Sequence, residues 1–121
     1  MQDFAERYTA AWCSQDPARV ASFFSADGSL RVNDGAPAVG RKAIAGVAQG
    51  FMSDFPDLVV IMDGIEVQGD RAVYRWTLAG TNAGRRVRIS GFEQWLMAED
   101  GLIAESQGHF DSDDYRRQLT P

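Results

Sequence analysis

The sequence predicts an α+β domain in which three helices pack on a curved, mainly antiparallel sheet. In the first half of the chain, apolar residues recur at helical spacing. From residue 58 onward, long strand-like stretches are separated by short turns that contain glycine. Helices and strands that are separated along the chain favour an α+β architecture over alternating units. The 121 residues are therefore expected to form one domain, 1–121.

The first two helices are predicted from spacing and from a start signal. Residues 2–14 form an amphipathic pattern that buries Phe4, Tyr8, Ala11 and Trp12. Asp16-Pro17 then restarts a helix, because Asp is a good N-cap and Pro suits the first helical position. This second helix is expected to bury Val20, Phe23 and Phe24 and to end at Asp27-Gly28.

A brief strand and a third helix are expected next. Residues 29–33 indicate the strand, and Asp34-Gly35-Ala36-Pro37 indicates a loop. The third helix begins near Gly40 and ends at Phe55-Pro56-Asp57. Its apolar stripe is regular and consists of Ile44, Val47, Ala48, Phe51 and Phe55.

The second half of the chain predicts a meander of four strands. The expected strands are Leu58–Gln68, Arg71–Thr81, Val87–Ala98 and Leu102–Asp111. A twisted sheet of this kind, curled around a long helix, forms a cone whose mouth is a natural small-molecule pocket.

Composition excludes several classes of partner. The net charge of -5 argues against nucleic acid, which requires a basic surface. No apolar run approaches the ~20 residues of a membrane span, so no membrane partner is expected. Cys13 is the one cysteine, which excludes an internal disulfide and fits a reducing, cytoplasmic setting.

The last predicted strand carries the most informative pattern. If the strand is regular, Glu105, Gln107, His109 and Asp111 share one face, because alternate side chains point the same way. His109 is the one histidine of the chain. If this face lines a concave pocket, it is suited to acid–base chemistry.

The order of elements and several local phrases resemble the NTF2-like superfamily, and more narrowly its SnoaL-like polyketide cyclase branch. The resemblance covers nearly the whole chain. Its phrases are residues 4–12, 16–28, 40–44, 54–58, 69–73, 100–105, 110–111 and 118–119. The superfamily contains isomerases, cyclases, dehydratases, epoxide hydrolases and binding domains, so the fold alone does not define the activity.

The resemblance implies roles for individual residues. SnoaL-like cyclases use an aspartate on the last strand as the acid–base catalyst, and Asp111 matches its position. Ketosteroid isomerases use a tyrosine on the first helix as an oxyanion donor, which Tyr8 matches. Their general base falls on Val32 here, so that mechanism is incomplete. The Asp-Arg-Asp set of limonene epoxide hydrolases is also incomplete after Arg75.

Together these observations predict a small-molecule pocket protein. We expect a cofactor-free and metal-free acid–base enzyme of isomerase, cyclase or dehydratase (lyase) type, acting on a hydrophobic carbonyl compound. Asp111 and His109 are the predicted acid–base groups, and Tyr8 is the predicted oxyanion donor. The expected pocket residues are Trp12, Asn33, Phe51, Phe55, Trp76 and Gln107.

Alternatives remain open at this stage. Asp111 could instead cap the turn and helix-like tail that begins at Ser112. The turn at Glu99-Asp100-Gly101 leaves the face of Glu93 undecided, because turns of different length give opposite faces. The alternative function is a non-catalytic ligand-binding or dimerisation module. Family analogy predicts a homodimer through the sheet in every case.

Overall fold

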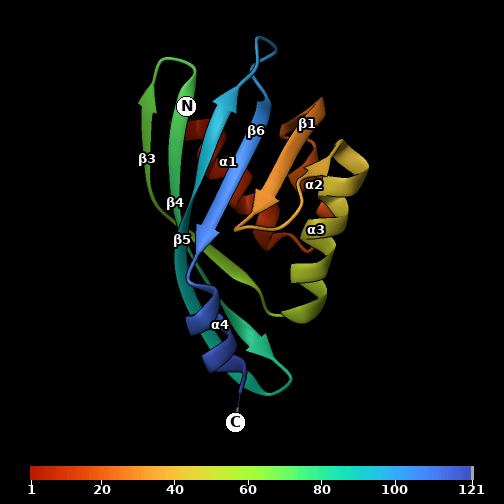
Figure 1. Cartoon of the computed structure of the whole chain (residues 1–121), viewed down its shortest axis with the longest axis vertical. Helices are drawn as coiled ribbons and strands as arrows, with labels where there is room; N and C mark the ends of the chain where they lie inside the picture. Colours follow the sequence, from red (N-terminus) through yellow and green to blue (C-terminus); the bar gives the residue numbers. More distant parts are fainter. Residues whose placement is uncertain (121) are drawn as a thin grey trace.

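Three helices lie along one face of a twisted sheet, and a fourth follows the last strand (Figure 1). The computed structural model describes residues 1–120. The helices are α1 (Gln2–Cys13), α2 (Pro17–Ala21), α3 (Arg41–Asp54) and α4 (Ser112–Leu119). This arrangement confirms the α+β class, with α4 added to the three predicted helices. None of these helices is both long and apolar enough to cross a membrane.

The sheet has six strands in the order β2-β1-β6-β5-β4-β3. Neighbouring strands are antiparallel except for β1 and β6, which are parallel. The strands are β1 (Phe24–Val32), β2 (Ala38–Val39), β3 (Val59–Gln68), β4 (Arg71–Asn82), β5 (Arg85–Met97) and β6 (Ile103–Phe110). The predicted meander thus corresponds to β3 through β6.

The second helix is shorter than predicted, and the first strand is longer. α2 ends at Ala21, whereas Phe24 begins β1 and pairs with Ile103 of β6. In a longer helix, the backbone groups of this segment would pair within the helix. Here they form hydrogen bonds with β6 instead. Gly28 lies inside β1, where an added Cβ would come within 2.9 Å of the Ile103 carbonyl oxygen. The helix end predicted at Asp27-Gly28 is therefore wrong.

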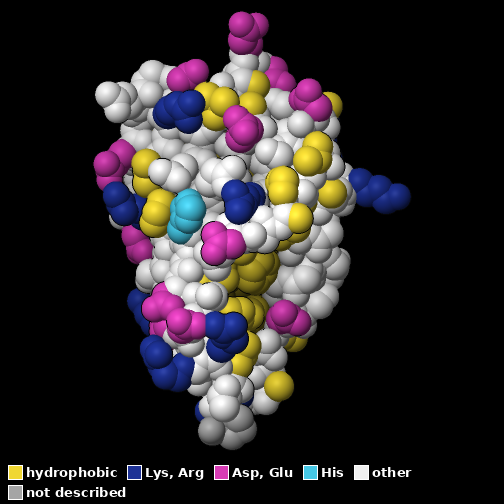
Figure 2. Space-filling view, viewed as in Figure 1, with side chains coloured by type: hydrophobic (Ala, Val, Ile, Leu, Met, Phe, Trp, Pro, Cys, Tyr) yellow, Lys and Arg dark blue, Asp and Glu magenta, His cyan; other side chains and the backbone are white. Residues whose placement is uncertain are grey.

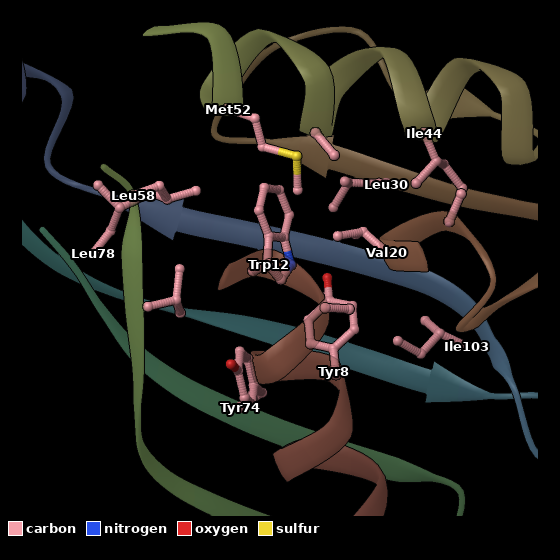
Figure 3. Packing of buried hydrophobic residues seen from close by; sticks show 14 of the residues in the cluster. Tyr8, Trp12, Val20, Leu30, Ile44, Met52, Leu58, Tyr74, Leu78 and Ile103 are labelled. Atoms are coloured by element: carbon pink, nitrogen blue, oxygen red, sulfur yellow. The ribbon is translucent and has the colours of Figure 1, made fainter. Parts of the chain in front are cut away.

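Aromatic rings fill the core between α1 and the sheet. Tyr8 and Trp12 project from α1 into this space (Figure 3). The Tyr8 ring meets Trp95 edge-on at 5.2 Å and Tyr74 edge-on at 5.4 Å. Tyr74 and Trp95 stack face to face at 5.0 Å. Edge-to-face and stacked pairs of this kind add to the free energy gained from burial itself, which anchors α1 to β4 and β5.

Gly91 of β5 allows a large ring to lie flat on the inner face of the sheet. It pairs with Trp76 across β4 and β5. A Cβ at Gly91 would lie 2.7 Å from Cζ2 of the Trp76 ring and even closer to the His109 carbonyl oxygen. The missing side chain therefore determines where the Trp76 ring sits.

We predict that Gly91→Ala lowers the free energy of unfolding by about 1–3 kcal/mol, because overpacking forces neighbouring groups to shift. Gly46→Ala is the control. Gly46 is exposed on α3 with no atom near a Cβ, so this change should stabilise the helix by about 0.5–1 kcal/mol. Urea denaturation of both variants measures the difference. Equal stability of Gly91→Ala and the wild type would contradict the prediction.

Candidate functional site

A cavity of about 60 Å³ lies between the sheet, α1 and α3. Its aromatic walls come from four elements and consist of Trp12, Phe51, Tyr74, Trp76 and Phe110. Aliphatic side chains complete the lining, and Glu93 is its one charged residue within the described part of the chain. Hydrophobic side chains also reach the surface between the sheet and α3 (Figure 2). An apolar cavity with a single polar group is typical of a ligand site.

Glu93 is placed in the cone by the pairing of β5 with β6. It lies opposite Gly108, and residues opposite each other in a sheet share a face. A Cβ at Gly108 would be in ordinary van der Waals contact with the Glu93 side chain, at 3.8 Å. Glu93 is only 7% exposed.

Three donors from three elements converge on one oxygen of Glu93. Oε1 accepts hydrogen bonds from Ser106 Oγ (2.7 Å), Tyr8 Oη (2.9 Å) and Trp95 Nε1 (3.1 Å). The other oxygen, Oε2, has one longer contact with Tyr8 Oη at 3.2 Å. Oε2 therefore keeps lone-pair capacity for a ligand.

The environment of Glu93 shifts its protonation. Burial raises the pKa of Glu93 above its ordinary value, and the hydrogen bonds from Ser106, Trp95 and Tyr8 offset part of this effect. Burial, together with the nearby Glu93 charge, also raises the pKa of Tyr8 well above its ordinary value. Tyr8 is therefore a neutral donor over the physiological range, whereas the protonated form of Glu93 is favoured relative to that of an exposed glutamate.

A hydrogen bond between α1 and β4 holds Tyr74, which pairs with Glu93 across β4 and β5. Thr9 Oγ1 and the Tyr74 hydroxyl lie 2.5 Å apart, and Thr9 also donates to the Ala5 carbonyl oxygen at 2.8 Å. Burial raises the pKa of Tyr74, so this hydroxyl is neutral as well. The ring of Tyr74 thus stays fixed as one wall of the cavity.

Of the predicted pocket residues, the structure places Trp12, Phe51 and Trp76 in the cavity lining. Tyr8 lies beneath the cavity. Its hydroxyl donates to Glu93 and is already engaged there. Tyr8 thus orients a carboxyl group in this structure, a different position from the oxyanion donor that the resemblance implies.

His109 points away from this cavity, so its predicted orientation is wrong. Glu105, Gln107 and His109 share one face, as predicted, but this is the outer face, because Ser106 and Gly108 between them are the buried positions. The bulge at Ala104, where Leu96 pairs with Glu105 and Met97 with Ile103, precedes this face and leaves its alternation regular. Gly108 and Phe110 therefore face the cone.

On the outer face of the sheet, the ring of His109 packs against Phe92 at 4.9 Å, and its Nε2 lies 3.1 Å from Gln94 Oε1. The same histidine, coloured cyan, is visible at the surface in Figure 2.

Asp111 lies at the beginning of α4 and outside the cavity lining. Its Oδ1 accepts hydrogen bonds from the backbone N–H groups of Asp113 (3.0 Å) and Asp114 (3.1 Å). This is N-cap geometry. The capping alternative describes its contacts. Asp111 and His109 border one surface hollow, whereas Tyr8 lies in the core, so the three residues do not converge on one cavity.

Three more predicted pocket residues lie elsewhere. Asn33 accepts a hydrogen bond from the Phe110 backbone and borders a separate surface hollow together with His109 and Asp111. Phe55 is fully buried and packs against Gly80. Gln107 lines a hollow on the outer face of the sheet. Their placement in the pocket is therefore corrected.

Glu93 is the charged cavity residue whose face sequence reasoning left undecided, although a signal was present. Along β5, the apolar residues Val87, Ile89 and Trp95 stand at alternate positions and are buried, and Glu93 falls in the same phase. A charged residue in an otherwise buried phase of a strand is unusual without a specific role. Within residues 1–120, no cluster of three or more His, Cys, Asp or Glu side chains is arranged to hold a metal ion.

Comparison with known proteins identifies the family. The model of the SnoaL-like domain matches residues 5–106, so the chain belongs to the SnoaL-like family. A search of curated proteins found no matching relative. TsrD from Streptomyces laurentii has a similar structure, with 27% identity, a TM-score of 0.84, and coverage of 98% of this chain and 92% of that one.

Two further solved structures share the fold. A protein of ketosteroid isomerase-like fold from Catenulispora acidiphila, in complex with trimethylamine, has 19% identity and a TM-score of 0.87, covering 98% and 94% of the two chains. A candidate SnoaL-like polyketide cyclase from Jannaschia sp. CCS1 has 14% identity and a TM-score of 0.80, covering 98% and 94%. Together with the family model, they confirm the NTF2-like fold that the sequence predicted.

We predict that Asp111→Ala lowers the free energy of unfolding by about 1 kcal/mol, because the N-cap bonds of α4 are lost. Asp111→Asn is the matched control, since its amide oxygen caps nearly as well. Thermal unfolding of the two variants measures the difference. Similar losses of stability in both variants would show that the cap is not what Asp111 contributes.

We also predict a pH-dependent difference between the wild type and Glu93→Gln. The folded protein holds the pKa of Glu93 above its unfolded value. The protonated form is therefore favoured by folding, and the wild type gains most at low pH. That advantage should decrease as the pH rises from the unfolded pKa through the folded one. Urea denaturation of both proteins from pH 4 to pH 8 tests this; parallel profiles would contradict it.

Proposed function

We propose that this protein is a cofactor-free acid–base enzyme that acts on a small apolar carbonyl compound in the cone cavity, with Glu93 as the group that transfers the proton. The observation that carries the proposal is a fully buried carboxyl group that lines an apolar cavity and keeps one oxygen available. Membership in a family related to polyketide cyclases agrees with chemistry at a carbonyl compound.

The chemistry follows from a single carboxyl group. Glu93 Oε2 removes a proton from the carbon next to a carbonyl, so the C–H bond breaks, an O–H bond forms and the electron pair moves into an enolate. The same carboxyl group then returns the proton to another carbon. One acid–base group is sufficient for such a transfer, which favours an isomerase over a reaction that requires separate acid and base groups.

The surroundings support this role. A raised pKa brings a carboxyl group closer to the pH at which it can both accept and return a proton. Ser106, Trp95 and Tyr8 fix the orientation of the carboxyl group through Oε1. Apolar walls exclude water from the enolate.

The decisive experiment uses 3-cyclohexen-1-one, whose conversion to the conjugated 2-cyclohexen-1-one is followed by ultraviolet absorbance. We expect Glu93→Gln to lose about 10²–10⁴-fold in rate, the usual contribution of a positioned acid–base group. Glu105→Gln is the matched control, because it makes the same charge change on an exposed part of β6, and it should keep the wild-type rate.

Two results would contradict the proposal. One is an unchanged rate in Glu93→Gln whose fold is intact by circular dichroism. The other is loss of rate in His109→Gln while Glu93→Gln stays active, which would move the chemistry to the outer hollow. Absence of turnover by the wild type, combined with saturable binding of the ketone, would favour the alternative of a non-catalytic ligand-binding module.

A further inference from the structure

Glu93 is a buried carboxyl group without a positively charged partner in the described chain. The ion pairs of residues 1–120 lie on the surface and do not include it. Its donors are the neutral groups of Tyr8, Trp95 and Ser106. Buried charges in proteins are normally paired, because an isolated ion is costly to remove from water. The ionised form of Glu93 therefore lacks a counter-charge.

The walls around Glu93 are suited to a cation. Trp12 and Phe51 meet edge to face at 6.0 Å, and Trp76 and Phe110 do so at 6.1 Å. These four rings come from α1, α3, β4 and β6, and all of them line the cavity. The electron-rich faces of aromatic rings attract cations, most strongly when water is excluded. An aromatic box with one carboxyl group thus combines the two elements that recognise an organic cation.

We infer that the cavity binds a small tertiary alkylammonium ion, with its N–H bonded to Glu93 Oε2 and its alkyl groups against the aromatic walls. A tertiary ammonium ion has one N–H donor, which matches one available carboxylate oxygen. A primary ammonium ion would bury two further donors against apolar walls, at a cost for each unpaired group. The cavity of about 60 Å³ favours short alkyl groups on the ligand.

This inference uses the Glu93 pocket but does not depend on catalysis. If the pocket also transfers protons, trimethylammonium should inhibit the ketone reaction competitively. Cation binding without turnover would leave the inference intact and remove the proposed activity. Turnover of the ketone without cation binding would overturn this inference and leave the proposed activity intact.

Calorimetric titration at neutral pH tests the inference with four compounds. These are trimethylammonium chloride, tetramethylammonium chloride, methylammonium chloride and the neutral tert-butanol, which approximates the shape of the first. We expect trimethylammonium to bind at least tenfold more tightly than tert-butanol and methylammonium. Tetramethylammonium should bind less tightly than trimethylammonium, because it has no N–H to donate.

Two variants test whether the Glu93 pocket is responsible for the preference for trimethylammonium. Glu93→Gln should lose trimethylammonium binding at least tenfold, and Glu105→Gln should retain it. Trp76→Leu keeps an apolar wall but removes a ring face, so the preference for trimethylammonium over tert-butanol should decrease several-fold. Trp76→Leu provides a second test if Glu93→Gln fails to fold by circular dichroism.

The pH dependence gives an independent measurement. The titratable groups that face Glu93 are Tyr8 from α1 and Tyr74 from β4, and both are neutral over the physiological range. Trimethylammonium binding should therefore weaken as Glu93 becomes protonated at lower pH. Equal affinities for trimethylammonium and tert-butanol, undiminished binding by Glu93→Gln, or no saturation at millimolar trimethylammonium would each overturn the inference.

Discussion

The hydrogen bonds to Glu93 are the interaction on which the pocket depends. Tyr8 reaches the carboxyl group from α1, Ser106 from β6 and Trp95 from the same strand, so one acceptor oxygen connects a helix to two strands. Burying a carboxyl group is costly, and these bonds offset part of the cost. If they were lost, α1 would lose one of its polar links to the sheet, and Glu93 would lose its orientation toward the cavity.

The cavity exists because small and large residues are matched across neighbouring strands. Gly91 lies against the Trp76 ring, where a Cβ would clash with it. This glycine gives space to its large neighbour, and the large side chains then define the walls. The stacked pair of Tyr74 and Trp95 holds the layer behind them rigid. The shape of the cavity is thus a consequence of core packing, in which groups are fixed to within fractions of an ångström.

The two protonation states of Glu93 give one pocket two possible uses. The protonated, neutral form suits an uncharged ligand and can return a proton to it. A bound cation would stabilise the ionised form, because no basic side chain of residues 1–120 pairs with it.

The sequence by itself determined the element types, since helical spacing on α1 and α3 and the turns between β3, β4, β5 and β6 are local signals. It also identified Trp12, Phe51 and Trp76, which the structure places in the cavity wall. Only the tertiary structure decided which face of β6 lines the cone. Alternation defines two faces of a strand without saying which is buried. The sequence therefore grouped Glu105, Gln107 and His109 on one face, but only the packing of the sheet placed that face outside the cone. The face of Glu93 depended likewise on the pairing of β5 with β6.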